Sequence, residues 1–141
     1  MVNVKIKKLN RNAIIPKYAH IGDAGMDFFS AENCTIEVGK RKLISTGISM
    51  ELPEGYFASI RGRSGLASKK GILVPGGVIE YTYRGEYKVI LLNSGDEDFD
   101  IKIGDRIAQV LIQPIATAEI EVVEELSESS RGSGGFGSTG N

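Results

Sequence analysis

A short segment with two leading glycines, residues 76–86, carries the side chains best suited to chemistry. Its sequence is GGVIEYTYRGE, with a carboxylate at Glu80 and an aromatic ring at Tyr83. Gly76 and Gly77 lack Cβ atoms, so a flat ligand could lie against the backbone and hydrogen-bond to its N–H and C=O groups. Strand-forming residues on both sides predict a β-hairpin. The segment therefore combines edge recognition, a general base and a stacking surface, although a purely structural hairpin would have the same pattern.

A second polar segment, residues 61–67, is suited to binding an anion. Its sequence is RGRSGLA, in which guanidinium groups and exposed backbone N–H groups both suit phosphate oxygens. Ser64 would cap a short helical turn and aim the partial positive charge of that turn at the same anion. The alternative is a basic loop with a capped helix and no ligand, since such a motif is weak by itself.

Two further residues extend this chemistry. Asp27 lies between small and apolar neighbours and could hold a hydrated Mg²⁺ ion through water, because Mg²⁺ gives up its water shell reluctantly. A turn-forming aspartate bonded to local backbone is the alternative. Gln109 lies inside an apolar run, residues 107–115, that predicts a strand covered on both faces. There it is either a satisfied core amide or a phosphate contact at the end of the strand.

The elements that must position these residues are short strands. The sequence predicts strands near residues 4–9, 35–38, 42–50, 57–60, 90–93 and 107–115, and a β-like stretch at residues 120–123. We count roughly ten short strands without a convincing long helix. The predicted fold is therefore all-β, a sandwich, barrel or jelly roll with at most one short helix.

Composition limits the possible functions. The chain has 141 residues, enough for one domain, and 17 basic against 18 acidic residues give a net charge of −1. This balance suggests neither a nucleic-acid partner nor a membrane surface. One cysteine and one histidine cannot make an internal disulfide or a zinc ligand set. We found no signal segment or membrane span, and we expect a cytoplasmic protein.

The last segment, residues 127–141, differs in composition from the rest. It is rich in glycine and serine and cannot build a core, so we expect a β domain over residues 1–126 followed by a flexible arm. Arg131, Phe136, Ser138 and Thr139 supply a guanidinium, a stacking ring and two hydroxyls. A lid that closes over a bound nucleotide would use such groups, although a plain terminus can have the same composition.

Taken together, the motifs resemble the homotrimeric deoxyuridine triphosphatases (dUTPases), and the likeness covers nearly the whole chain. One motif alone would be weak evidence, but five in the family's order are specific. They are AGMDF at residues 24–28, RSGLA at 63–67, GVIE with YRGE at 77–86, GDRIAQ at 104–109 and the glycine-rich segment at 131–140.

The resemblance implies hydrolysis of dUTP to dUMP and pyrophosphate by a water that attacks the α-phosphorus, with Mg²⁺ on the triphosphate. It also implies a trimer whose active sites are shared between chains. Asp27 would hold the metal through water, Glu80 would polarise the attacking water, and Arg106 would brace the motifs. Substrate contacts would come from Arg63, Ser64, Gly65, Gly77, Ile79, Tyr83, Gln109, Arg131, Phe136, Gly137, Ser138 and Thr139.

The resemblance also assigns parts of the nucleotide to individual residues. Backbone around Gly77 and Ile79 would read the uracil edge and leave no room for a 5-methyl group. Tyr83 would pack beneath the deoxyribose, where a 2′-hydroxyl would not fit. Phe136 would stack on uracil.

The sequence departs from the family pattern at Glu80, where family members carry aspartate. The basicity of glutamate is similar, with a reference pKa about 0.4 units higher, but the extra methylene displaces the carboxylate. A displacement of about 1 Å can cost about a hundredfold in rate, so we expect slowed turnover. A dUTP-binding regulator with little turnover is the alternative. A dCTP deaminase is disfavoured, because its chemistry needs an acid in the strand at residues 89–93 and this strand has none.

Overall fold

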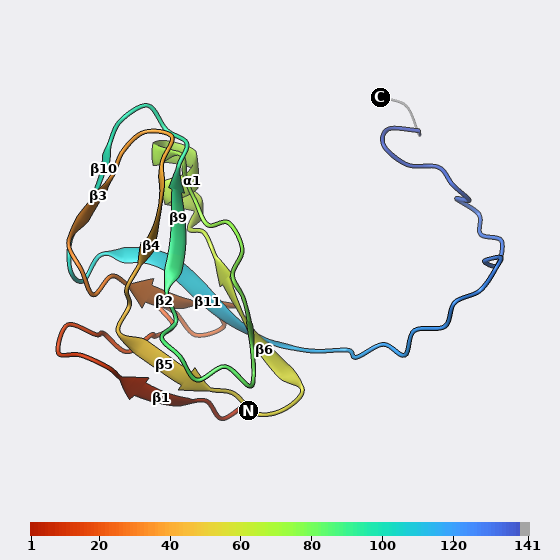
Figure 1. Cartoon of the computed structure of the whole chain (residues 1–141), viewed down its shortest axis with the longest axis horizontal. Helices are drawn as coiled ribbons and strands as arrows, with labels where there is room; N and C mark the ends of the chain where they lie inside the picture. Colours follow the sequence, from red (N-terminus) through yellow and green to blue (C-terminus); the bar gives the residue numbers. More distant parts are fainter. Residues whose placement is uncertain (139–141) are drawn as a thin grey trace.

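The computed structural model describes residues 1–138, and the chain folds into small β-sheets with one short helix in that range. Figure 1 shows a body of strands and a long C-terminal arm that leaves it. The elements are β1 (Lys5–Lys8), β2 (Met26–Phe29), β3 (Cys34–Ile36), β4 (Arg41–Ile44), β5 (Ile48–Glu51), β6 (Tyr56–Arg61), α1 (Ser64–Lys70), β7 (Ile72–Leu73), β8 (Val78–Glu80), β9 (Val89–Asn93), β10 (Phe99–Ile101) and β11 (Arg106–Pro114). The all-β prediction is confirmed.

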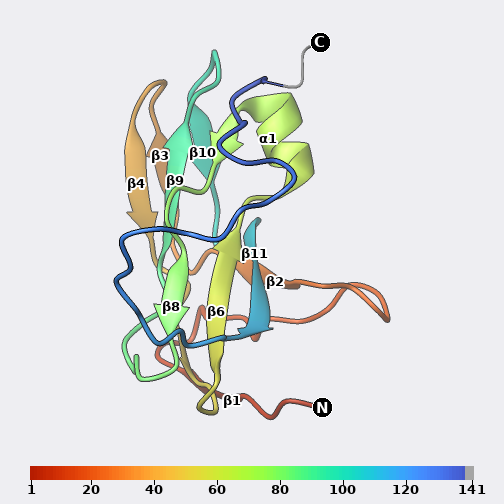
Figure 2. The same cartoon turned by 90° about the vertical axis from the view of Figure 1, so that its right-hand side faces the viewer.

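The strands form four antiparallel sheets. The largest has the order β2-β11-β6-β8, a second has the order β4-β9-β7, and β1-β5 and β3-β10 are two-stranded. Figure 2 shows β8, β6 and β11 side by side. No sheet closes into a barrel within residues 1–138, and the sheets together make a distorted jelly roll.

The core lies between these sheets and follows the two-residue period of the strands. In β9, Val89 and Leu91 are buried while Ile90 faces outward. In β11, the neighbours Ile107 and Ala108 are both buried, because a bulge after Arg106 shifts the register there. Beyond Val110, β11 is only partly covered, so the prediction that residues 107–115 are buried on both faces is wrong for its second half.

The predicted hairpin at residues 76–86 is wrong. Strand β8 pairs with β6, whereas β9 pairs with β4 and β7, so the two strands belong to different sheets. The connecting residues, 81–88, cross from one sheet to the other. They are fastened midway by an isolated bridge between Ser49 and Glu86 and by the buried ring of Tyr87. Pairing with distant strands therefore outweighed the local turn signal.

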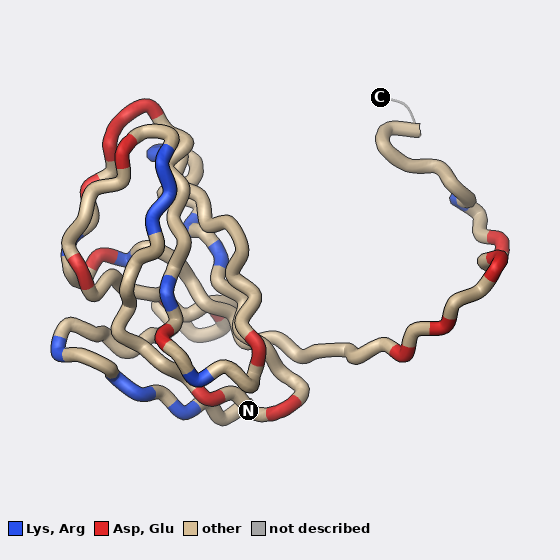
Figure 3. Tube along the Cα trace, viewed as in Figure 1, with Lys and Arg blue, Asp and Glu red and all other residues tan. Residues whose placement is uncertain are grey.

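The C-terminal segment, residues 115–138, which includes the described part of the predicted arm, has no strand. Its last backbone hydrogen bond to the body runs from the Ile115 N–H to the Gly55 carbonyl, 2.8 Å. The predicted β-like stretch at residues 120–123 is wrong in this chain, because an isolated extended segment has no ladder partner for its N–H and C=O groups. Ile120 and Val122 are 82% and 93% exposed. Acidic side chains dominate the charged residues along the arm (Figure 3).

The single helix in residues 1–138, α1, has seven residues. No helix in that range is long and apolar enough to cross a membrane.

Candidate active site

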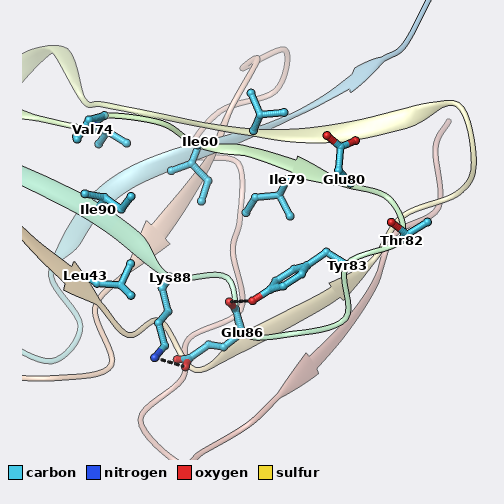
Figure 4. Close-up of a pocket in the computed structure, with 13 residues that line it drawn as sticks. Leu43, Ile60, Val74, Ile79, Glu80, Thr82, Tyr83, Glu86, Lys88 and Ile90 are labelled. Atoms are coloured by element: carbon cyan, nitrogen blue, oxygen red, sulfur yellow. Dashed lines mark hydrogen bonds and ion pairs between the residues drawn. The ribbon is translucent and has the colours of Figure 1, made fainter. Parts of the chain in front are cut away.

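A cavity of about 630 Å³ lies beside β8, and four of the predicted site residues line it: Gly77, Ile79, Glu80 and Tyr83. Figure 4 shows the apolar side chains on the opposite wall of the cavity, among them Leu43, Val74 and Ile90. Most of the wall is therefore hydrocarbon, with a few polar groups along one side. This is the usual make-up of a small-molecule pocket.

Glycine is required at position 77. Its φ is 103°, in the region that disfavours residues with a side chain, and a Cβ there would collide with the Ile60 carbonyl oxygen. The close approach allows the Ile60 N–H to donate to the Gly77 carbonyl, 2.7 Å. β8 is the edge strand of its sheet. The side of β8 that faces away from β6 therefore offers N–H and C=O groups to a flat ligand.

Tyr83 is held with its ring in the cavity wall. Its hydroxyl donates to the backbone carbonyl of Glu86, 3.0 Å, and its ring lies 5.8 Å from that of Tyr87. Gly85 is needed beside it, because a Cβ at this position would collide with the Tyr83 hydroxyl. The Tyr83 side chain remains 45% exposed and can contact a ligand.

Glu80 lies at the rim of the cavity. Figure 4 shows Ile79 and Glu80 on opposite sides of β8, with the Glu80 carboxylate directed away from Tyr83. Among residues 1–138, no group hydrogen-bonds to this carboxylate. Because directly paired residues of antiparallel strands share a face, Glu80 shares the outer face of the four-stranded sheet with its partner Phe57.

A second cluster of predicted residues lies elsewhere on the same face. The Asp27 carboxylate, 15% exposed, is 3.3 Å from the Arg106 guanidinium and 3.8 Å from that of Arg63. The Arg63 Nη1 also donates to the Arg106 carbonyl, 3.2 Å. Asp27 is therefore held by two arginines and is not simply bonded to its own turn.

Gln109 joins this cluster as the direct cross-strand partner of Asp27. Its Nε2 donates to the Gly62 carbonyl, 2.9 Å, so half of the amide is satisfied by the protein. Gly25 leaves room for the amide oxygen of Gln109, because a Cβ at residue 25 would lie 2.6 Å from the Gln109 Oε1.

The predicted helix at residue 64 is present, but the predicted cap is wrong. Arg63 is the N-cap, with an extended backbone, and Ser64 is already the first helical residue; no side chain caps this end. The hydroxyl of Ser64 therefore does not cap the N-terminus of the helix. The first-turn N–H groups, including that of Gly65, have no partner within the helix and are open to an anion.

The donor set around Asp27 suits a metal only through water. Within residues 1–138 no three His, Cys, Asp or Glu side chains gather closely enough to bind a cation directly. One carboxylate already paired with two arginines would hold a hydrated cation only through the water shell of that cation.

The last residues of the arm lie well apart from the body of strands of their own chain (Figure 1). Arg131 bonds to the Gly134 carbonyl, 2.8 Å, and the Ser138 N–H bonds to the Gly135 carbonyl, 3.0 Å, so these contacts are local. Phe136 is fully exposed. Gly137 has a φ of 89° in the same turn, and Thr139 lies outside the described residues.

Sequence reasoning placed Arg61 in the anion-binding segment at residues 61–67 but gave Glu86 no role of its own. Arg61 faces Gln109 across β6 and β11, and its Nε donates to the Ser59 Oγ, 2.9 Å. Glu86 accepts hydrogen bonds from the Ser45 hydroxyl and from the Gly47 N–H, 2.8 Å. No local pattern indicates these contacts, because Ser45 and Gly47 lie 41 and 39 residues before Glu86 in the sequence.

The ionisation of Glu86 follows from these contacts. Burial raises the pKa of its carboxyl. The hydrogen bonds from Ser45 and Gly47, together with the Lys88 ammonium 3.7 Å away, lower the pKa by more than burial raises it, so the pKa lies below its usual value. Burial also raises the pKa of Tyr87 to about 12, and its hydroxyl has no hydrogen-bond partner within the described residues.

Comparison with known proteins identifies a family. The dUTPase family model matches residues 11–140. A deoxyuridine 5'-triphosphate nucleotidohydrolase of Clostridium acetobutylicum is 53% identical over 99% of this chain and 98% of its own. A dUTPase variant of Staphylococcus bacteriophage 80alpha, solved with dUpNHpp, has a TM-score of 0.93 at 32% identity and covers 99% of both chains. A dUTPase variant of S. aureus phage phi11, whose structure describes a structural Mg(II) ion, has a TM-score of 0.82 at 29% identity over 89% of this chain and 99% of its own.

Proposed function

The chain belongs to the dUTPase family, and we propose on that basis that it is a dUTP diphosphatase, which hydrolyses dUTP to dUMP and pyrophosphate. The cavity beside β8 is the observation that carries this proposal. It combines a bare backbone edge, an aromatic ring and a carboxylate within one segment of the chain.

Recognition of the base is assigned to backbone groups of Gly77 and Ile79. Uracil presents alternating donors and acceptors along one edge, and the free edge of β8 presents N–H and C=O groups that complement them. Gly77 lets the strand lie directly on β6, so the position of this edge is fixed by the sheet. A rigid edge can reject a base with a 5-methyl group, because the wall cannot retreat.

Recognition of the sugar is assigned to Tyr83. A flat ring that is hydrogen-bonded at its hydroxyl and packed on a buried neighbour gives the deoxyribose a firm surface. A 2′-hydroxyl would be pressed against this ring without a polar partner, which costs binding energy.

Phosphate binding is assigned to Arg63, Ser64, Gly65 and Gln109, with Arg106 as the brace of Asp27. Guanidinium groups and free first-turn N–H groups are good phosphate ligands. Bound Mg²⁺ would neutralise phosphate charge and orient the triphosphate, with Asp27 contacting its water shell. The paired state of Asp27 supports an indirect contact of this kind, because two arginines already compensate its charge.

Glu80 is assigned the role of polarising the attacking water. Its carboxylate is exposed at the cavity rim and has no hydrogen-bond partner in residues 1–138, so it is free to accept a proton from water. The family places an aspartate here, and the longer side chain shifts the carboxylate. Turnover is therefore slower than with aspartate, by up to about a hundredfold.

One site needs more than one copy of the chain. Glu80 pairs with Phe57, whereas Asp27 connects through Gln109 to Arg61, four positions further along β6. At about 3.3 Å per residue and about 4.8 Å per strand, Asp27 and Glu80 are about 20 Å apart. This is longer than a triphosphate, so the cavity of one copy and the arginine cluster of another complete one site. We propose a homotrimer with three such sites.

The arm of a further copy completes each site. We propose residues 1–126 as the β domain and residues 127–141 as a flexible arm, in which Arg131, Phe136, Gly137, Ser138 and Thr139 close over the nucleotide. The arm extends away from the body of its own chain, which supports closure on a neighbour (Figure 1).

Pyrophosphate release from dUTP, dTTP, dCTP and UTP tests the proposal. We expect release from dUTP with a strong preference over the other three. Ammonia from dCTP would indicate a deaminase, and tight dUTP binding without product would indicate a regulator. We also place this activity in the cytoplasm, with no nucleic-acid or membrane partner, which the near-zero net charge supports.

A further inference from the structure

We propose that Glu86 is a positioning residue for Tyr83 and thereby sets the preference for deoxyribonucleotides over ribonucleotides. The inference rests on the proposed function, in which Tyr83 packs beneath the sugar. Glu86 touches no substrate in this account and acts through the contacts that its carboxylate and its backbone make.

The carboxylate of Glu86 fastens the segment that carries Tyr83 to the turn between β4 and β5. Its Oε1 accepts from the Ser45 hydroxyl and from the Gly47 N–H, 2.8 Å. Its Oε2 lies 3.7 Å from the Lys88 ammonium, and the side chain is only 21% exposed. Hydrogen bonds to a partly buried carboxylate are among the stronger ones in proteins, so this attachment is firm.

The backbone of Glu86 then fixes the ring of Tyr83. The Glu86 carbonyl accepts from the Tyr83 hydroxyl, 3.0 Å, and an isolated bridge to Ser49 holds the same residue beside β5. Figure 4 shows the ring of Tyr83 ending at Glu86, across the mouth of the cavity. A shift of Glu86 therefore moves the acceptor that sets the tilt of the ring.

Tyr87 supplies the second support of this ring. It is fully buried, packs edge-on against Phe28 at 6.4 Å, and lies 5.8 Å from Tyr83. Contact with Tyr87 limits how far the Tyr83 ring can move inward, and the hydrogen bond to Glu86 limits how far its hydroxyl end can swing outward. Loss of the Glu86 carboxylate keeps the backbone carbonyl but frees it to shift, so the second limit is loosened and a 2′-hydroxyl gains room.

The ratio of kcat/KM for dUTP to kcat/KM for UTP tests this role. We expect Glu86→Ala to lower the ratio about tenfold, with a smaller fall for Glu86→Gln, whose amide oxygen can still accept from Gly47. Glu54→Ala, in an exposed turn, is the matched control and should leave the ratio unchanged. If Glu86→Ala does not fold, Glu86→Gln carries the test.

A double-variant cycle separates positioning from general damage. Tyr83→Phe removes the hydroxyl that bonds to Glu86, and we expect it to lower the same ratio. The pair of substitutions should then be no worse than the more harmful one, because both act through one contact. Additive effects, or an equal loss for dUTP and UTP, would overturn the inference.

Binding of dUDP and UDP, measured in parallel, keeps this test separate from turnover. A wild-type chain that binds dUDP over UDP but releases no pyrophosphate refutes the proposed hydrolase and leaves the test of Glu86 intact. A wild-type chain with no preference between the two diphosphates contradicts both.

Discussion

The cavity beside β8 and the arginine cluster around Asp27 are built in opposite ways. Most polar groups of the cavity come from one continuous segment, residues 77–88, and the rest of its wall is apolar. The arginine cluster draws charged side chains from β2, the start of α1 and β11, which are far apart in the sequence. In the proposed function, the rigid backbone edge selects the base, whereas the converging charges hold phosphates regardless of the base. Selectivity and phosphate binding can therefore be changed separately by substitution.

The largest expected effect comes from Gly77→Ala. The new Cβ would collide with the Ile60 carbonyl oxygen at a φ of 103°, so the strand edge must move. We expect a loss of at least about a hundredfold in kcat/KM for dUTP, together with about 2 kcal/mol of stability. Gly22→Ala is the matched control, because its φ is 90° but no atom lies within 4 Å of the added Cβ. Similar losses in both variants would mean that backbone strain alone is responsible.

The next effect is a gain. Glu80→Asp shortens the side chain by one methylene, to the residue that the resemblance implies at this position, so single-turnover dUTP hydrolysis should become faster by up to about a hundredfold. Binding of a non-hydrolysable dUTP analogue should change little. An equal or faster rate with the native glutamate would show that the longer side chain is well placed.

A smaller effect is expected in the arginine cluster. Arg63→Ala removes a guanidinium beside Asp27 and should raise KM for dUTP about tenfold. The preference for dUTP over dCTP should stay the same, because the base is read elsewhere. Arg41→Ala, an exposed arginine on β4, serves as the control. A changed base preference in Arg63→Ala would contradict the assignment of base selection to the cavity and of phosphate binding to the arginine cluster.

The smallest effect concerns acid stability. The folded pKa of Glu86 lies below its usual value of 4.5, so its contribution to the free energy of unfolding is complete above that value. This contribution is lost as the pH falls from 4.5 through the folded pKa. Glu86→Gln should therefore have a shallower loss of stability in this range, measured by urea unfolding at several pH values. Identical pH profiles for both chains would contradict the role of the carboxylate as a charged anchor.

Sequence reasoning was most successful where the signal was local. Gly77, Glu80 and Tyr83 lie within seven positions and line one cavity, as residues from one short segment can be expected to do. The predicted hairpin failed because β8 and β9 found better partners in β6 and β4, and no local rule encodes that choice. The β-like stretch at residues 120–123 failed for a similar reason, since no strand of the same chain pairs with it.

The contacts within the arginine cluster could not be predicted from the sequence either. Asp27 was recognised as a candidate by its type and its neighbours, but its two ion pairs depend on the register of β2 with β11 and on the path from β6 into α1. The contacts of Glu86 with Ser45 and Gly47 depend on the crossing between two sheets. Such contacts follow from topology and not from spacing.

Mixing two inactive variants tests most directly whether one site joins the cavity of one copy to the arginine cluster of another. Glu80→Gln disables the first region, and the double substitution Asp27→Ala with Arg63→Ala disables the second. Co-expressed variants should form mixed trimers that regain about a quarter of wild-type dUTP hydrolysis, because that share of sites would join two intact regions at random. Activity no greater than the sum of the separate variants would contradict the shared site.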